Sequence, residues 1–185
     1  MDDNIFGPAV VTPKGKLFFF DFDTPNTQAK HPKNLYPSDK YDVTLGFTSD
    51  TDLAGLQKAC SDVAVQAFGS ADGVDLPFAN GDEKAMDSMK GHTIIRAKSG
   101  KRPGLVDGKK GRITEEECDA GMWARLHVTP MSYTSGKNKG VTLILKNAQV
   151  LTETAYTSLV GPADAESAFG VEEESGSIGS STVPF

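Results

Sequence analysis

Apolar residues along this chain recur with a period of two in several short runs, which predicts β-strands. The alternation is strict at residues 41–47, and the short aromatic run at 16–22 and the run at 92–99 also have strand character. Two longer runs occupy residues 122–133 and 140–151, and the polar, glycine-containing connection TSGKNKG between them favours a hairpin. We therefore expect at least five strands, and the run GPAVV near the start is a candidate for one more.

One stretch of the chain follows a different period. Between residues 49 and 69 apolar side chains recur at three- and four-residue steps, which predicts a helix with Ser49 or Asp50 as its N-cap and Gly69 as its end. Short strands, 19 Gly and 10 Pro favour turns and loops over a helical bundle. The expected fold is mainly β, an OB-fold-like small antiparallel barrel with one helix and long loops.

The length of 185 residues has room for one domain and a tail. We assign residues 1–160 to the OB-fold-like domain and residues 161–185 to a flexible, acidic C-terminal tail. That tail is expected to be disordered, because it cannot bury enough apolar surface to offset the entropy of ordering it. No run of 18 apolar residues and no signal-peptide pattern occurs, so we expect no membrane association and a cytoplasmic location.

Alternation also assigns faces to the strands. Phe18, Phe20 and Phe22 are expected to share one face of the first strand, and the strand at 41–47 is expected to be half buried. The two cysteines, one in the predicted helix and one in an acidic turn, have neither a disulfide framework nor a metal-binding spacing. No cofactor is expected.

The strand at 122–133 carries an unusual outward face. Its even-numbered residues from Met122 to Val128 are expected to face the core, which turns Trp123, Arg125 and His127 to the opposite side. A tryptophan beside an arginine and a histidine on a solvated sheet face is uncommon. If the faces of neighbouring strands coincide, an aromatic ring lies among several cations.

The formal net charge of -6 is unevenly distributed. Residues 1–83 carry 6 Lys+Arg and 13 Asp+Glu, residues 84–146 carry 13 and 6, and residues 147–185 carry none and 6. The basic block contains the glycine-rich loop KSGKRPGLVDGKKGR at 98–112. Charge sorted into blocks indicates a polyanionic partner for the middle of the chain, which the overall charge hides.

An aromatic platform with cations around it matches the needs of unpaired nucleic acid, because Lys and Arg hold phosphates while bases stack on rings. The predicted contacts are a platform of Trp123, Arg125, His127, Arg96 and Lys98 with Lys146 beside it, a clamp of Lys101, Arg102, Lys109, Lys110 and Arg112, and secondary rings at Phe19, Tyr36 and Tyr133. We expect a binder of single strands without catalytic activity. The choice between DNA and RNA stays open at this point.

Other interpretations of the same residues stay open. In the first, Trp123 packs beneath a loop and the charges form a plain solvated face, so that no platform exists. Asp21 and Asp23 share one face of the first strand and would hold a divalent cation in a metal-dependent nuclease or recombination enzyme, although no third ligand has a matching spacing. A third alternative is an interaction protein that contacts basic partners through its acidic blocks.

The chain resembles the phage single-stranded-DNA-binding proteins with an OB-fold. The resemblance lies in GPAVVTPKGKLFFFDF, KYDVTLGF, HTIIRAKSGKRPGLVDG and GMWARLHVTPMSYTSGKNKGVTLILKNAQVL, and its most specific parts are RPGLVDG and GVTLILKNAQVL. It implies sequence-independent binding of single-stranded DNA in phage replication, recombination or repair, without catalysis. A homo-oligomer is compatible with it, and the location implied is the cytoplasm of the host cell.

The resemblance also gives the tail a role. In bacterial and many phage single-stranded-DNA-binding proteins an acidic C-terminus ending in Phe recruits replication and recombination proteins. This chain carries Glu172, Glu173 and Glu174, then a Gly/Ser-rich spacer, and ends in Val183, Pro184 and Phe185. The spacer separates the acids from the tip, whereas they adjoin it in the bacterial pattern. The six residues are the predicted partner-binding set, and the glutamates are expected to compete weakly with DNA for basic residues.

Overall fold

A computed structural model describes residues 3–152, so the predicted domain boundary at 160 and the predicted tail lie outside the described residues. The elements are β1 (Val10–Val11), β2 (Gly15–Asp21), β3 (Tyr41–Thr48), α1 (Ala54–Phe68), β4 (Ala79–Asn80), η1 (Gly81–Glu83), η2 (Asp87–Met89), β5 (His92–Ser99), β6 (Gly104–Val106), η3 (Glu115–Glu117), β7 (Trp123–Ser135) and β8 (Asn138–Val150). The five predicted strands and the predicted helix are all present.

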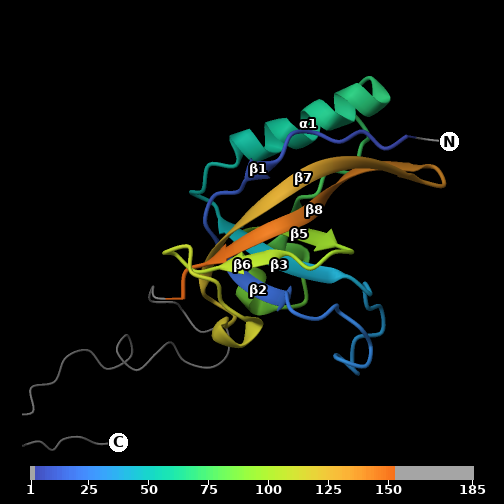
Figure 1. Ribbon diagram of the computed structural model, residues 1–185. Coiled ribbons are helices and arrows are strands. Elements are labelled where there is room, and N and C mark those ends of the chain that lie inside the picture. Colours follow the sequence, from blue (N-terminus) through green and yellow to red (C-terminus); the bar gives the residue numbers. More distant parts are fainter. Residues whose placement is uncertain (1–2, 153–185) are drawn as a thin grey trace, which may run out of the picture.

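Five strands close into a barrel in the order β2, β3, β5, β8, β7 and back to β2 (Figure 1). Four of these pairings are antiparallel, and the fifth, between β5 and β8, is parallel with Ala97 opposite Leu143. The prediction of a small, mainly β barrel with one helix is confirmed. The parallel contact was not predicted, because alternation carries no information about strand direction.

The barrel interior and the inner side of α1 form one core. Leu17, Leu45, Leu126 and Leu143 from four strands of the ring are at most 1% exposed. Helix α1 lies along β7 and β1 (Figure 1) and adds a buried stripe to the same cluster. The stripe comprises Leu56, Cys60, Val63 and Ala64. Met122, directly before β7, and Ala124, Leu126 and Val128 of β7 face this core as predicted.

A β-bulge in β2 overturns the predicted face of the phenylalanines. Leu17 pairs with Leu45 and Phe19 with Thr44, so the register shifts between them and Phe18 is the extra residue. Phe18 packs outside the barrel on Met89 and Ile94, whereas Phe22 belongs to the core and Phe20 packs against it. The bulge leaves Phe19 half exposed, at 50%.

Three further expectations need correction. Helix α1 begins at Ala54, whose N–H donates to the Asp52 side chain, so neither Ser49 nor Asp50 is its cap. Its predicted end is confirmed, because Gly69 takes the left-handed conformation (φ 82°) and closes the last turn. Strand β6 lies inside the predicted loop 98–112. Strand β3 is buried on both faces instead of one, because other segments cover its outer side.

No helix among residues 3–152 is long and apolar enough to cross a membrane.

Candidate nucleic-acid interface

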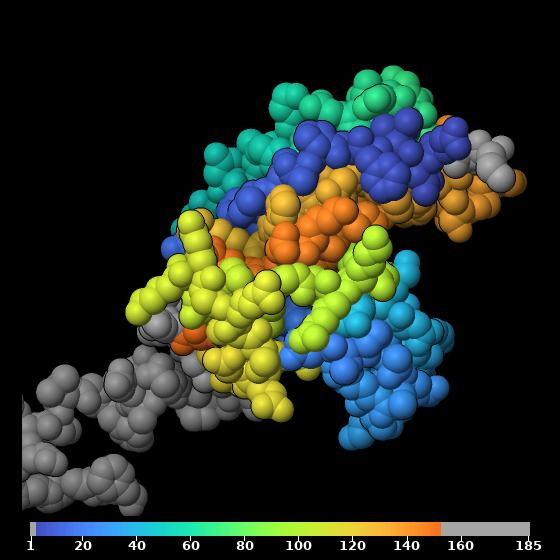
Figure 2. All heavy atoms as spheres, in the orientation of Figure 1, coloured from blue at the N-terminus to red at the C-terminus, as the bar shows by residue number. Residues whose placement is uncertain are grey.

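A groove with a volume of about 1000 Å³ runs over the outer side of β2, β3 and β5. One wall is the connection 22–40 between β2 and β3, and the other walls are the segment 75–89 and the far part of the β7–β8 hairpin. In the space-filling view the connection 22–40 (blue) and the far part of the hairpin (gold) stand apart from each other (Figure 2). The groove is partly open to solvent, so a ligand can enter it from the surface.

Aromatic side chains line this groove without being buried. Phe19 from the bulge of β2 is 50% exposed, and Tyr36 from the connection 22–40 is 86% exposed. Tyr133 of β7, which is partly buried, lines the same groove. The three secondary rings predicted from the sequence therefore come together. Exposed rings in a groove offer flat apolar faces to a ligand that stacks.

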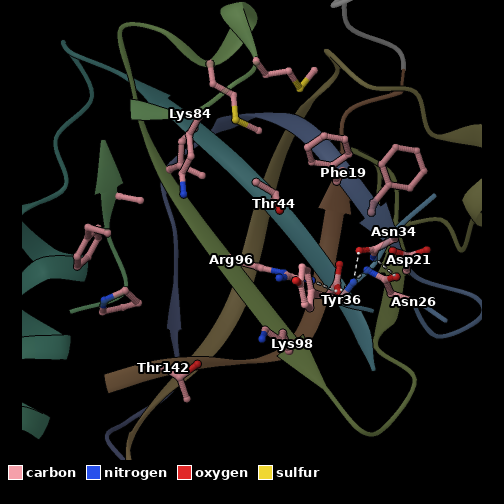
Figure 3. Close-up of a pocket in the computed structure, with 18 of the residues that line it drawn as sticks. Phe19, Asp21, Asn26, Asn34, Tyr36, Thr44, Lys84, Arg96, Lys98 and Thr142 are labelled. Atoms are coloured by element: carbon pink, nitrogen blue, oxygen red, sulfur yellow. Dashed lines mark hydrogen bonds and ion pairs between the residues drawn. The ribbon is translucent and has the colours of Figure 1, made fainter. Parts of the chain in front are cut away.

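Two cations lie on the floor beside these rings. Arg96 and Lys98 occupy successive outward positions of β5 (Figure 3). The pKa of Lys98 is lowered, first by burial and then by the positive charge of Arg96. The negative charge of Asp42 acts in the opposite direction but is outweighed. A lysine that is partly desolvated beside a second cation is stabilised by an incoming anion, so this end of the floor suits a phosphate.

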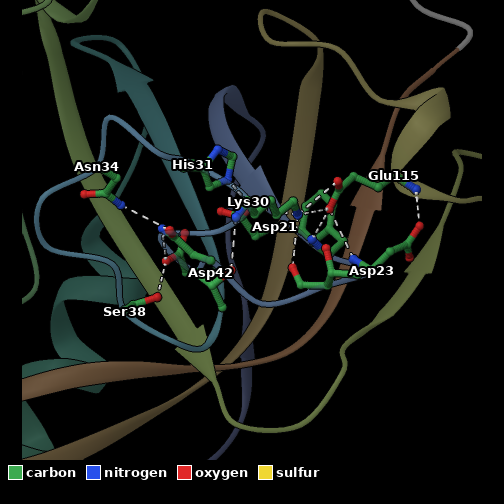
Figure 4. Close-up of polar contacts among 12 residues, drawn as sticks. Asp21, Asp23, Lys30, His31, Asn34, Ser38, Asp42 and Glu115 are labelled. Carbon is green, nitrogen blue, oxygen red and sulfur yellow. Dashed lines mark hydrogen bonds and ion pairs between the residues drawn. The ribbon is translucent and has the colours of Figure 1, made fainter.

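Two carboxylates are buried under the groove, directly opposite each other in the β2–β3 register. Asp21 is 3% exposed and lies 2.8 Å from Lys30 Nζ and 2.6 Å from His31 Nε2. Asp42 is 2% exposed and accepts three hydrogen bonds. Their donors are the side chains of Asn26, Ser38 and Arg96, at 3.0, 2.6 and 2.7 Å. All partners except Arg96 belong to the connection 22–40 (Figure 4).

A second network ties the same connection to η3. Lys30 Nζ lies 3.2 Å from Glu115 Oε2, and the N–H of Glu115 donates to Asp23 Oδ2. Burial works to lower the pKa of Lys30, but its hydrogen bonds to Asp21 and Glu115 outweigh this and raise it. Burial works to raise the pKa of Asp23, but the N–H of Glu115 and the guanidinium of Arg102 outweigh this and lower it. Charge pairing therefore holds the wall of the groove in place.

The other predicted platform residues lie on a different side of the barrel. Trp123 and His127, partly buried, and the exposed Arg125 project from the outer face of β7, and none of them lines the groove. Arg125 lines a shallow hollow with β1 and the start of α1. Lys146, exposed on β8, lies on the same side, next to Asn147, whose side chain is 3.0 Å from His127 Nδ1. The predicted platform is thus divided into two surfaces.

The predicted clamp surrounds β6. This short strand pairs with β8 opposite Asn147, Ala148 and Gln149, so the loop lies beside the outer face of the barrel between β5 and β7. Lys101, Arg102, Lys109, Lys110 and Arg112 are all exposed there. Arg102 Nη2 lies 2.6 Å from Asp23 Oδ1, which joins the clamp to the groove wall.

Asp21 and Asp23 do not form a metal site with their surroundings. Among residues 3–152 no group of three or more His, Cys, Asp or Glu side chains could hold a metal ion. Lys30 contacts Asp21 and Arg102 contacts Asp23, so each acid already has a cationic partner. Both cysteines are buried, and burial raises the pKa of each thiol to about 12. Such thiols are poor nucleophiles and poor metal ligands at neutral pH.

Several groove residues carry no clear signal in the sequence. Asn26, Asn34 and His31 belong to a proline-punctuated loop, and Lys84 and Met86 to a stretch without periodicity. Only the placement of these loops over the outer face of the barrel brings them together (Figure 3). A proline-rich loop of this length was the one available hint, because long ordered loops are often functional.

Barrel, helix and groove together define a binding protein of the OB-fold class. A profile of the family described as Enterobacter phage Enc34, ssDNA-binding protein, matches residues 23–178. The chain therefore belongs to the Enc34 family of phage single-stranded-DNA-binding proteins.

Solved structures with the same fold include other phage proteins. The single-stranded DNA-binding protein from bacteriophage Enc34 gives a TM-score of 0.62 at 19% identity, over 87% of this chain and 89% of that chain. Its complex with ssDNA gives 0.60 at 18% identity, over 77% and 85%. The single-stranded DNA binding protein gp2.5 of bacteriophage T7 gives 0.55 at 14% identity, over 89% and 97%. No curated protein matches the sequence.

Proposed function

We propose that this protein binds single-stranded DNA without sequence preference and that the strand lies in the groove over β2, β3 and β5. The observation that carries this proposal is the presence of two exposed rings, Phe19 and Tyr36, in one groove with Arg96 and Lys98. Rings stack on any base and cations hold any phosphate, so neither contact reads sequence. A structure of the Enc34 protein in complex with ssDNA supports the binding of single-stranded DNA, and the place of the strand is our own proposal.

We further propose that a longer strand leaves the groove past Lys98 and continues around the barrel. Lys98 is paired with Ile144 of β8, and Asn147 of β8 is paired with His127 of β7, so the outer surface is continuous from β5 to β7. The basic loop around β6 lies beside this path. The predicted clamp and the Trp123 surface would then contact later nucleotides of one strand.

The biological role that we propose is protection and presentation of single strands during phage DNA replication, recombination or repair in the host cytoplasm. The six tail residues from Glu172 to Phe185 named above would recruit partner proteins; they lie outside the described residues.

Deleting residues 171–185 should raise the affinity for single strands and change its dependence on salt, because the glutamates compete with phosphates. Unchanged affinity and salt dependence would remove the competition.

The proposal includes no catalytic step. Incubation of labelled single-stranded DNA with the protein and magnesium should leave the strand intact while its mobility in a gel shifts. Cleavage that disappears on replacing Asp21 or Asp23 would instead establish the nuclease alternative.

The groove is tested by removing one ring inside it and one outside it. Phe19→Ala should weaken binding of oligo-dT about 5- to 150-fold, because stacking contributes about 1 to 3 kcal/mol per base. Phe6, at 59% exposure, lies outside the groove, so Phe6→Ala is the matched control and should leave affinity unchanged. Affinities come from fluorescence anisotropy of labelled oligo-dT at fixed salt. Equal affinities of the two variants would place the DNA elsewhere.

A further inference from the structure

The two acids beneath the groove, Asp21 and Asp42, carry the same negative charge as the polyanion that we propose as its ligand. Asp42 lies near the start of β3, the strand between β2 and β5, and lines the same groove as Phe19 and Lys98. A carboxylate in this place repels phosphate and also loses hydration on burial. The contacts of Asp42 must therefore favour DNA binding or folding by more than these two effects disfavour them.

The contacts of Asp42 link a cation of the groove to one of its walls. A single oxygen, Oδ2, accepts from Arg96 Nη2 at 2.7 Å, from Ser38 Oγ at 2.6 Å and from Asn26 Nδ2 at 3.0 Å. Arg96 is the cation that faces the groove, with its side chain 42% exposed while that of Asp42 is 2% exposed. Ser38 and Asn26 belong to the wall that carries Tyr36. One buried oxygen thus joins the phosphate-facing cation to the ring-bearing wall.

The geometry points to Asp42 as a positioning residue for single-stranded DNA: we propose that it fixes the guanidinium of Arg96 and the wall 22–40 in their DNA-binding arrangement. An arginine held at one nitrogen keeps its remaining N–H groups in a fixed plane toward the groove, so less entropy is lost when a phosphate binds. The inference rests on the groove being the DNA site.

Neighbouring acids sharpen the proposal. Asp21 lies opposite Asp42 but contacts Lys30 and His31, so it anchors the wall without touching Arg96. Asp75 also lines the groove, and it is exposed, with its backbone N–H and C=O bound to Lys139 and Val141 of β8. Asp42 and Asp75 therefore carry the same charge in the same groove, and only Asp42 orients a cation.

The test replaces each of these two acids by its uncharged isostere. Asp42→Asn should weaken binding of oligo-dT about tenfold, although it makes the protein less negative, because a charge-assisted hydrogen bond that orders Arg96 is lost. Asp75→Asn should bind equally well or more tightly, as charge alone dictates. Binding by Asp42→Asn that is as tight as that of Asp75→Asn would overturn the proposal.

A double-mutant cycle separates positioning from general stability. In an Arg96→Ala background, Asp42→Asn should cost less than about threefold, since the residue that it orients is gone. The slope of log affinity against log salt should fall by about 1 for Arg96→Ala and for Asp42→Asn, without adding in the double variant. An undiminished tenfold loss in the Arg96→Ala background would reduce Asp42 to a purely structural role.

A second variant covers the case in which Asp42→Asn does not fold. Arg96→Lys keeps the charge but loses the planar group that Asp42 holds, so it should bind nearly as weakly as Arg96→Ala. Full affinity of Arg96→Lys would show that orientation is unimportant. Failure of the groove itself is recognised separately, because Phe19→Ala and Arg96→Ala would then both bind normally.

Discussion

At the scale of single residues, the shape of the groove depends on Gly46 in β3. The ring of Phe18 lies where a side chain would be, since an added Cβ would come within 2.3 Å of Phe18 Cε2. Phe18 is the extra residue of the bulge, and the bulge is what leaves Phe19 exposed in the groove. A glycine on the central strand therefore makes room for one phenylalanine and thereby presents the next.

Gly46→Ala should consequently affect both stability and binding. The methyl group has to displace Phe18, which should lower the free energy of unfolding by about 1 to 3 kcal/mol and weaken oligo-dT binding through Phe19. Gly55 in α1 has open space around its Cα, so Gly55→Ala is the control and should stabilise the fold slightly through helix propensity. Urea denaturation and anisotropy titrations measure the two effects. Equal stability of both variants would contradict the packing described for Phe18.

At the scale of elements, the connection 22–40 is an ordered wall made without regular secondary structure. It is held by Asp21, Asp42 and Glu115, all of which belong to other elements or their ends. Arg102 and the N–H of Glu115 add contacts to Asp23, at the start of the connection. Charge pairs, which depend on pH, thus help to fix the wall, together with the burial of Phe22 at its start.

Asp23→Asn should therefore destabilise the protein in a pH-dependent way. The folded pKa of Asp23 lies below its ordinary value of 3.8, so the carboxylate contributes stability above about pH 3.8 that is lost as pH falls through the folded pKa. The difference in melting temperature between wild type and variant should be constant from neutral pH down to about 5 and shrink in stronger acid. Asp62→Asn, which breaks an exposed pair with Lys58, is the control and should change little. A difference that grows toward acid pH would contradict the assigned contacts.

At the scale of the whole molecule, the predicted contacts lie on two connected surfaces, and the only tryptophan lies on the second of them. Short oligo-dT of about 5 nucleotides should fill the groove and leave the emission of Trp123 nearly unchanged. Oligo-dT of about 20 nucleotides should continue around the barrel and quench it. Fluorescence titrations with the two lengths, with anisotropy as proof of binding, test the path. Strong quenching by the short strand would make the Trp123 surface the primary site.

The predicted platform also shows which features the sequence could predict and which it could not. Alternation correctly turned Trp123, Arg125 and His127 away from the core, because parity decides inside from outside. It could not decide on which side of a closed barrel an outward residue lies, and β7 is separated from β5 by β8 on one side and by β2 and β3 on the other. The groove depends on a bulge and on two ordered loops, neither of which follows a period.

The parallel pairing of β5 with β8 has a consequence for biosynthesis. Strand β8 contacts β5, β6 and β7, and it supplies Val141 and Thr142 to the groove. A nascent chain emerging from the ribosome cannot close the ring until this strand has left the exit tunnel, so the earlier strands wait with unpaired edges. The protein should acquire its affinity for DNA abruptly, once β8 has emerged and completes the ring.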